Sequence, residues 1–181
     1  MNIEIAKMLL GILTPISLAI IGYFINKTLA EQGRQWKEND ILIAKRMEIY
    51  SKMAEPLNQI YCYVQDVGDY KEQQPKDVIE NKRICDRAFH TYRPIWSKET
   101  IDSYKEFMRS AFKMFSGSGV DAKIRTVSTE KKAAAKVGAT THWLPEWDNQ
   151  ITEERDTEHH KKYVALMNAI SQDLRFTIIF K

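Results

Sequence analysis

One long uncharged run constrains the fold of this chain more than any other feature. It extends from Met8 to Asn26, MLLGILTPISLAIIGYFIN, and lies between Lys7 and Lys27. A helix of these 19 residues is about 28 Å long, close to the roughly 30 Å hydrocarbon core of a bilayer. The run therefore predicts a transmembrane anchor helix over residues 1–26.

A cleaved secretory signal and a buried core helix also contain apolar runs. This run is longer than the apolar centre of a typical signal, and bulky residues rather than small ones follow it. A buried helix usually has a polar stripe, whereas only Thr14 and Ser17 are polar inside this run. We therefore expect a membrane span.

A single span cannot enclose a channel by itself, so a channel requires several copies of the chain. Gly11 and Gly22 fall on one face and allow close approach of another helix, which makes them candidates for an oligomer interface. Thr14 and Ser17 are candidate pore-lining residues. Hydrogen bonding of these hydroxyls within the helix, beside Pro15, is the alternative.

Positive charge is unevenly distributed around the span. Before it there are only Lys7 and Glu4, whereas several Lys and Arg residues follow it. The positive-inside rule then places residues 27–181 in the cytoplasm.

The composition of the remaining chain favours helices. Seven glycines and five prolines in 181 residues give little of the turn punctuation that a strand-rich protein needs. The fold class predicted is all-α, a transmembrane helix continuing into one cytosolic helical bundle over residues 27–181.

A long stalk helix is predicted over residues 27–66, because apolar residues recur there with a heptad spacing. One seam begins with Leu29, Trp36 and Ile43, and the other with Gly33 and Asp40. Two arrangements are possible and compatible. The helix can pack on its own domain, and it can also contact the same helix in other copies of the chain. Trp36 and Ile43 are candidate oligomer-interface residues.

Further helices are predicted over residues 76–92, from an N-cap at Ser97 to Gly117, and from Thr152 onwards. Between the last two, residues 116–150 lose helical periodicity and carry an excess of basic residues. A connection of this length predicts a loop-rich insertion with a function of its own.

One polar segment has a recognisable spacing: Arg155 is followed by four residues and then His160. Such a pair allows the His to move the proton of an RNA 2'-hydroxyl while the Arg stabilises phosphate charge, as in HEPN ribonucleases. The alternative is a solvated, ion-paired first turn of the last helix. There is no zinc-spaced Cys/His set and no glycine-rich phosphate loop, so we predict no metal and no cofactor.

The span, the helical body and the degenerate Arg155/His160 pair together resemble a family of small membrane accessory proteins. Members of this family are encoded beside the RNA-guided RNA-targeting effector of type VI-B CRISPR systems. The resemblance implies an HEPN-like bundle, a homo-oligomeric pore in the bacterial inner membrane, and depolarisation that enhances interference. We take a ring of about eight subunits as the working assumption. It also implies that Arg155 and His160 are the functional pair, in catalysis, structure or gating.

Three functions therefore follow from the sequence. The first is an antiviral pore with a functional link to the RNA-targeting effector. The second is a membrane-tethered HEPN ribonuclease that uses Arg155 and His160 and binds RNA. The third is a non-enzymatic membrane scaffold for a partner protein.

Overall fold

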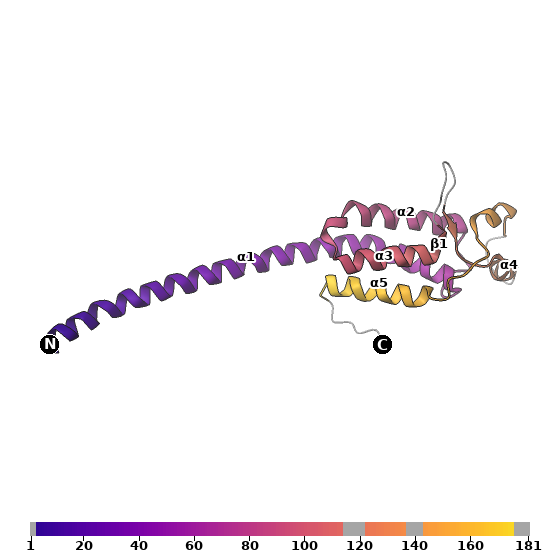
Figure 1. The fold of residues 1–181 in the computed structure, drawn as a ribbon. Coiled ribbons are helices and arrows are strands. Elements are labelled where there is room, and N and C mark those ends of the chain that lie inside the picture. The colour runs from indigo at the N-terminus through magenta and orange to yellow at the C-terminus, as the bar shows by residue number, and fades with distance from the viewer. Residues whose placement is uncertain (1–2, 114–121, 137–142, 176–181) are drawn as a thin grey trace. The chain divides into compact units, whose positions relative to one another are not determined.

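The computed structural model describes residues 3–113, 122–136 and 143–175, without the side chains of residues 3–22, 34–36, 38 and 134–136. The fold is mainly helical (Figure 1), which confirms the all-α prediction. The elements in chain order are α1 (Ile3–Gln65), α2 (Pro75–Thr91), η1 (Arg93–Ile95), α3 (Lys98–Ala111), β1 (Phe112–Lys113), β2 (Lys123–Ile124), α4 (Ser128–Lys136), η2 (Pro145–Gln150) and α5 (His159–Asp173).

Two compact units divide the chain, one over residues 1–42 and the other over residues 43–181. Helix α1 contributes to both, and its C-terminal part belongs to the second unit, the bundle. Within the first unit, large apolar side chains are more than half exposed to solvent: Tyr23, Phe24, Ile25, Leu29 and Ile41.

The C-terminal part of α1 supplies one wall of the bundle core. Its fully buried residues recur every three or four positions, which places them on one face of the helix: Ile49, Met53, Leu57, Ile60 and Val64. The helix ends at Gln65, and the next residue, Asp66, has a left-handed φ of 57°. The Val67 amide donates to the Cys62 carbonyl over 3.1 Å. This is the hydrogen bond of a Schellman cap.

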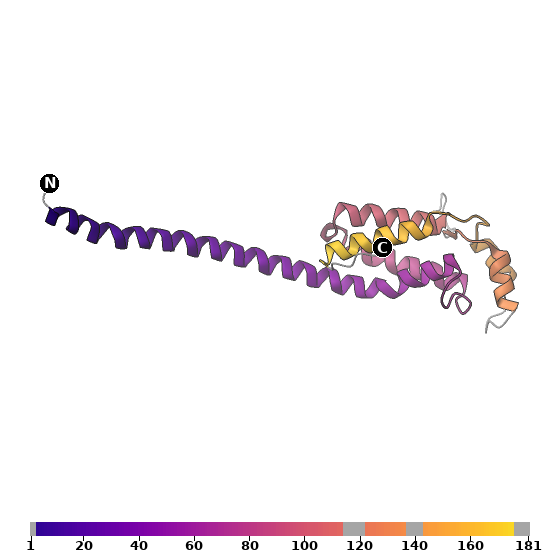
Figure 2. The ribbon, with the colours of Figure 1, turned by 90° about the horizontal axis from the view of Figure 1, so that it is seen from below.

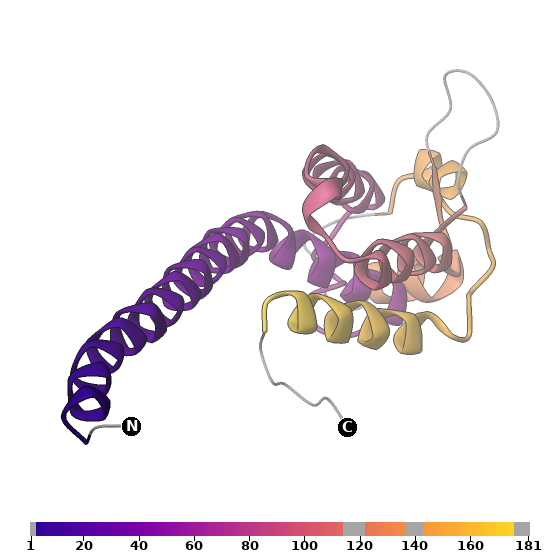
Figure 3. The same cartoon turned by 60° about the vertical axis from the view of Figure 1, so that its left-hand side comes forward.

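Helices α2, α3 and α5 complete the bundle, and α3 and α5 lie side by side in every view (Figure 1; Figure 2; Figure 3). Each faces the core with fully buried apolar residues, such as Cys85 and Phe89 on α2, Tyr104 and Phe107 on α3, and Leu166 on α5. The rings of Phe89 and Tyr104 stack with centroids 3.9 Å apart. Packing of these buried apolar side chains therefore holds the four helices together.

The predicted starts of two helices are confirmed. Helix α2 begins at Pro75, and the Ser97 hydroxyl caps α3 by accepting a hydrogen bond from the Thr100 amide. The predicted end of α3 at Gly117 is wrong. Phe112 has extended backbone and pairs with Ile124, and because both side chains are fully buried, this two-stranded pairing is favoured over another helical turn.

The predicted start of the last helix at Thr152 is also wrong, because α5 begins at His159. Glu153 has a left-handed φ of 60°, which is incompatible with a helical turn. The Thr152 hydroxyl accepts a hydrogen bond from the Glu154 amide over 3.2 Å, so it stabilises a local turn instead of a helix.

The predicted membrane span over residues 8–26 requires a correction. Among the residues that the structure describes, no helix is both long enough and apolar enough to cross a bilayer. From Lys27 onwards, charged residues recur every few positions along α1, which interrupts any apolar stretch there. The finding contradicts the predicted location, a single pass through the bacterial inner membrane with residues 27–181 in the cytoplasm.

A buried ion pair joins α1 to the C-terminal end of α5 and to the segment just before α3. The Arg46 guanidinium donates to the carbonyl oxygens of Ile95 (2.6 Å) and Asp173 (2.7 Å), and lies 3.5 Å from the Asp173 carboxylate. That carboxylate also accepts from the Ser97 amide (2.9 Å) and the Thr100 hydroxyl (2.8 Å). The Asp173 side chain therefore has a partner for each of its oxygens.

Replacing Asp173 by Ala is expected to destabilise the bundle by about 3 to 5 kcal/mol, because it leaves the Arg46 cation buried without a counter-ion. Denaturation in urea measures this loss as a change in the free energy of unfolding. Asp102→Ala is the matched control, since it removes a carboxylate from an exposed pair with Lys98. Equal losses in the two variants would contradict the role given to the buried pair.

Candidate functional site

The two residues of the Arg-x4-His spacing lie in different local structures. Arg155 is in the irregular segment before α5, and His160 is in the first turn of that helix. The expectation of a single helical turn carrying both residues therefore fails. What the two side chains share is a contact with the C-terminal end of α1.

Arg155 is held by two carboxylates. Its guanidinium donates to Asp66 Oδ2 and, over 2.6 Å, to Glu130 Oε2. About one third of the Arg155 side chain is exposed, and partial burial lowers the pKa of its guanidinium. The positive charge of Arg155 is therefore compensated by two carboxylates of the chain in this arrangement.

His160 is exposed and bonded to a tyrosine of α1. Its Nδ1 lies 2.8 Å from the Tyr61 hydroxyl. The ring of Tyr61 stacks on that of Tyr163, with centroids 4.2 Å apart, and burial raises the pKa of the Tyr61 phenol. Because Tyr61 holds one ring nitrogen of His160, its hydrogen bond fixes the orientation of the imidazole against the bundle.

A buried lysine from α4 completes the group around Asp66. Lys131 is only 4% exposed, and its ammonium donates to Asp66 Oδ1 and to the Tyr63 carbonyl oxygen. The ammonium also lies 4.1 Å from the centroid of the Tyr63 ring and 4.6 Å from that of Tyr70. Burial lowers the pKa of Lys131 to about 7, and the Glu130 carboxylate opposes this shift. The contacts with Asp66, the Tyr63 carbonyl and the two ring faces also favour a charged ammonium.

Asp66, Glu130, Lys131 and Arg155 are called the Asp66 cluster from here on. It connects the end of α1, helix α4 and the segment before α5. In the sequence Lys131 is one basic residue among several in the segment 116–150, and its buried partner lies 65 positions away. Sequence spacing alone contains no signal that would have singled out this pair.

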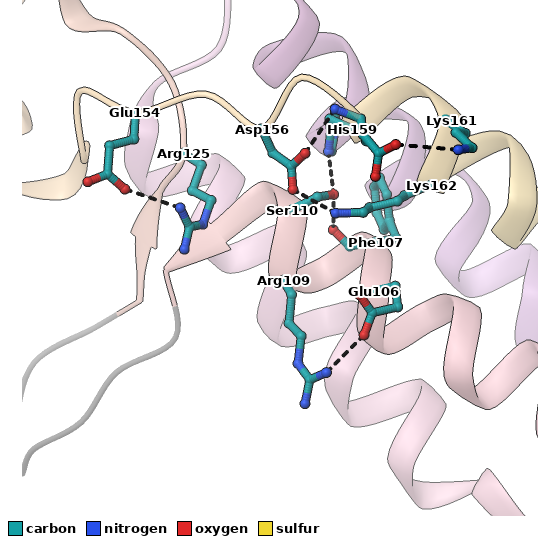
Figure 4. Close-up of polar contacts among 11 residues, drawn as sticks. Glu106, Phe107, Arg109, Ser110, Arg125, Glu154, Asp156, His159, Lys161 and Lys162 are labelled. Atoms are coloured by element: carbon teal, nitrogen blue, oxygen red, sulfur yellow. Dashed lines mark hydrogen bonds and ion pairs between the residues drawn. The ribbon is translucent and has the colours of Figure 1, made fainter.

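His159, next to the predicted His160, is the buried imidazole of the bundle (Figure 4). Its Nδ1 lies 2.7 Å from the Ser110 hydroxyl, which donates to the Phe107 carbonyl oxygen over 2.7 Å. The Nδ1 atom is therefore the donor to Ser110, and Nε2 has no partner among the described residues. Burial lowers the pKa of His159 to about 4, so the ring is neutral near pH 7.

The Ser110 and His159 pair has the chemical groups of a nucleophile and its base, but it is enclosed. Both side chains are fully buried, and the Phe107 ring covers the imidazole with centroids 5.1 Å apart. A substrate cannot reach the hydroxyl in this arrangement. The pair instead pins α3 to the start of α5.

A shallow surface groove of about 300 Å³ lies over α3 and the start of α5. Charged side chains line most of it: Asp102, Glu106, Glu158, Lys161 and Lys162. They pair with one another or with neighbours, as Figure 4 shows for Glu106 with Arg109 (2.8 Å) and Lys162 with Asp156 (2.7 Å). The groove therefore offers little uncompensated charge to a ligand.

Of the other predicted site residues, only Ile43 has a described side chain. The side chains of Thr14, Ser17 and Trp36, and the positions Gly11 and Gly22, lie outside the part of the chain whose side chains are described. Ile43 is half-buried at the start of the bundle unit. Over the described residues, no group of three or more His, Cys, Asp and Glu side chains is arranged to hold a metal ion.

Comparisons with known proteins do not assign the chain to a family. No family model matches the sequence, and neither a curated protein nor a solved structure shows significant similarity to the chain.

The buried imidazole predicts a specific acid sensitivity. Because the pKa of His159 is about 4 in the folded chain and near 6.5 when unfolded, the unfolded chain binds more protons between these values. The stability contributed by the neutral ring is therefore present above pH 6.5 and is lost as the pH falls to 4. The loss amounts to about 3 kcal/mol.

Urea denaturation at a series of pH values measures this dependence. His159→Gln is expected to flatten the dependence between pH 6.5 and 4, whereas His160→Gln, at the exposed neighbour, retains it. If both variants keep the wild-type slope, His159 is not the group responsible.

Proposed function

We propose that this chain is a non-enzymatic accessory protein of RNA-guided, RNA-targeting CRISPR defence, with an HEPN-like bundle. In this proposal the chain works as a homo-oligomeric ring that assembles through helix α1. Assembly is supported by a structural observation, whereas the link to the RNA-targeting effector comes from the family resemblance alone.

The observation that carries assembly is the exposure of large apolar side chains on α1. Ile25 is 54% exposed and Leu29 59% exposed, and they share one face of the helix. Large apolar side chains that stay exposed on a helix mark a surface that another element can cover. Contact with α1 of another copy would remove these side chains from solvent.

The spacing on this face suits a helix-to-helix contact. Leu29, Gly33 and Asp40 occupy heptad positions on it, and nothing lies within 4 Å of the position where a side chain would start on Gly33. The gap at Gly33 allows close approach of a second helix. Asp40 is a polar heptad residue of the kind that limits which registers two helices can adopt.

The contacts of Arg155 and His160 favour the non-enzymatic alternative over the ribonuclease. The Arg155 charge is compensated by Asp66 and Glu130, and His160 is bonded to Tyr61. Both residues stabilise the junction between α5 and α1 in this arrangement. The predicted pore and depolarisation depend on the membrane span, so they are not part of this proposal.

Leu29→Glu is expected to convert the assembled chain into a monomer, because it places a charge on the contact face. Sedimentation equilibrium of the full chain measures the mass. Thr28→Glu is the matched control, since it adds the same charge about 100° around the helix, off the proposed contact face. A wild-type chain that is monomeric at all accessible concentrations, or equal loss of assembly in both variants, would contradict the proposal.

RNA cleavage tests the enzymatic alternative separately. We expect purified wild-type chain and His160→Ala to leave single-stranded RNA equally intact, because the His160 Nδ1 is bonded to Tyr61 and is not available as a general base. Cleavage by the wild type that disappears in a folded His160→Ala chain would favour the ribonuclease instead.

A further inference from the structure

The Asp66 carboxylate lies between two cations from different parts of the chain. Its Oδ1 accepts from Lys131 on α4, and its Oδ2 accepts from Arg155 before α5. A Lys ammonium and an Arg guanidinium that converge on one anionic group are also the usual protein ligands of a phosphate. The cluster therefore holds two phosphate-binding groups with an internal carboxylate between them.

We propose that Lys131 and Arg155 form a binding site for a phosphate group, and that Asp66 occupies this site when no ligand is bound. A phosphate carries up to two negative charges and offers at least two free oxygens, so it satisfies both cations better than a single carboxylate does. Binding would release Asp66 and with it the direct contact of Arg155 to the end of α1.

The two cations differ in how far the protein holds them in place. Lys131 retains the Tyr63 carbonyl and the ring faces of Tyr63 and Tyr70 after Asp66 leaves, so its ammonium stays where it is. Arg155 is about one third exposed, which gives a ligand access from solvent. The Lys131 ammonium is thus preorganised, and the Arg155 guanidinium is accessible to a ligand from solvent.

The two competing carboxylates, Asp66 and Glu130, differ in backbone setting and exposure. Asp66 has a φ of 57° and is followed by Gly68 with a φ of 62°, so the chain leaves α1 through left-handed residues rather than through a helix or strand. The Glu130 side chain, which also pairs with Arg155, is 56% exposed and can rotate into solvent. The Asp66 side chain is 17% exposed, and the two cations are its side-chain hydrogen-bond partners among the described residues, so a ligand that satisfies both cations competes with it directly.

The same chemistry is present in inorganic phosphate and in the backbone of single-stranded RNA. Both are therefore used as probes of the full-length chain. Isothermal titration with inorganic phosphate measures affinity, and RNA without a terminal phosphate is the competitor. If RNA displaces bound inorganic phosphate, the site also accepts a phosphodiester. If RNA does not displace it, the site accepts free phosphate only.

The decisive variant is Asp66→Asn, which removes the charge, keeps the size and suits the left-handed backbone. We expect it to bind inorganic phosphate about tenfold more tightly than wild type. Glu154→Gln is the control, because it removes a carboxylate from the exposed pair with Arg125 and should leave the affinity unchanged. Adding Arg155→Gln to Asp66→Asn should abolish the gain.

Asp66→Gly is the second variant, since glycine adopts a φ of this sign without strain and removes the carboxylate completely. Circular dichroism establishes that each variant is folded. If folded Asp66→Asn or Asp66→Gly binds phosphate no more tightly than wild type, the proposal is overturned. Equal gains in Asp66→Asn and Glu154→Gln would overturn it as well, because the effect would then be one of net charge.

Discussion

The bundle depends on the burial of one face of α1 over its C-terminal part. Leu57 and Ile60 on this face are completely buried, and α2, α3 and α5 supply the remaining core around them. The same helix exposes Leu29 and Ile41 to solvent nearer its N-terminus. One helix thus has two environments, and the proposed assembly follows from the part that its own chain does not cover.

Buried polar contacts fix which parts of the chain meet α1 at each end of the bundle. At one end, the pair of Arg46 and Asp173 joins α1 to the end of α5. At the other end, Asp66 joins the end of α1 to α4 through Lys131 and to the segment before α5 through Arg155. Such contacts cost desolvation, so their main effect is to select one arrangement of the helices. The Asp66 cluster is the more exposed of the two, which is why we assign ligand binding to it.

The sequence predicted elements whose signals are local, such as Pro75 at the start of α2 and Ser97 as the cap of α3. It failed where tertiary contacts decide. Burial of Phe112 ends α3 early, and His159 is fully buried although it lies in a run of charged residues. The location in the inner membrane was inferred from the apolar run of residues 8–26 and from the charges that flank it, and it is contradicted by the described helices.

Hydrogen exchange along α1 at increasing protein concentration tests directly whether this helix joins copies of the chain. Amides of residues 49–64 lie in the core of the bundle, so their protection should not depend on concentration. If α1 assembles with other copies, amides of residues 23–41 should become protected as the concentration rises, by mass action. Protection of residues 23–41 that is the same at every concentration would contradict assembly through α1.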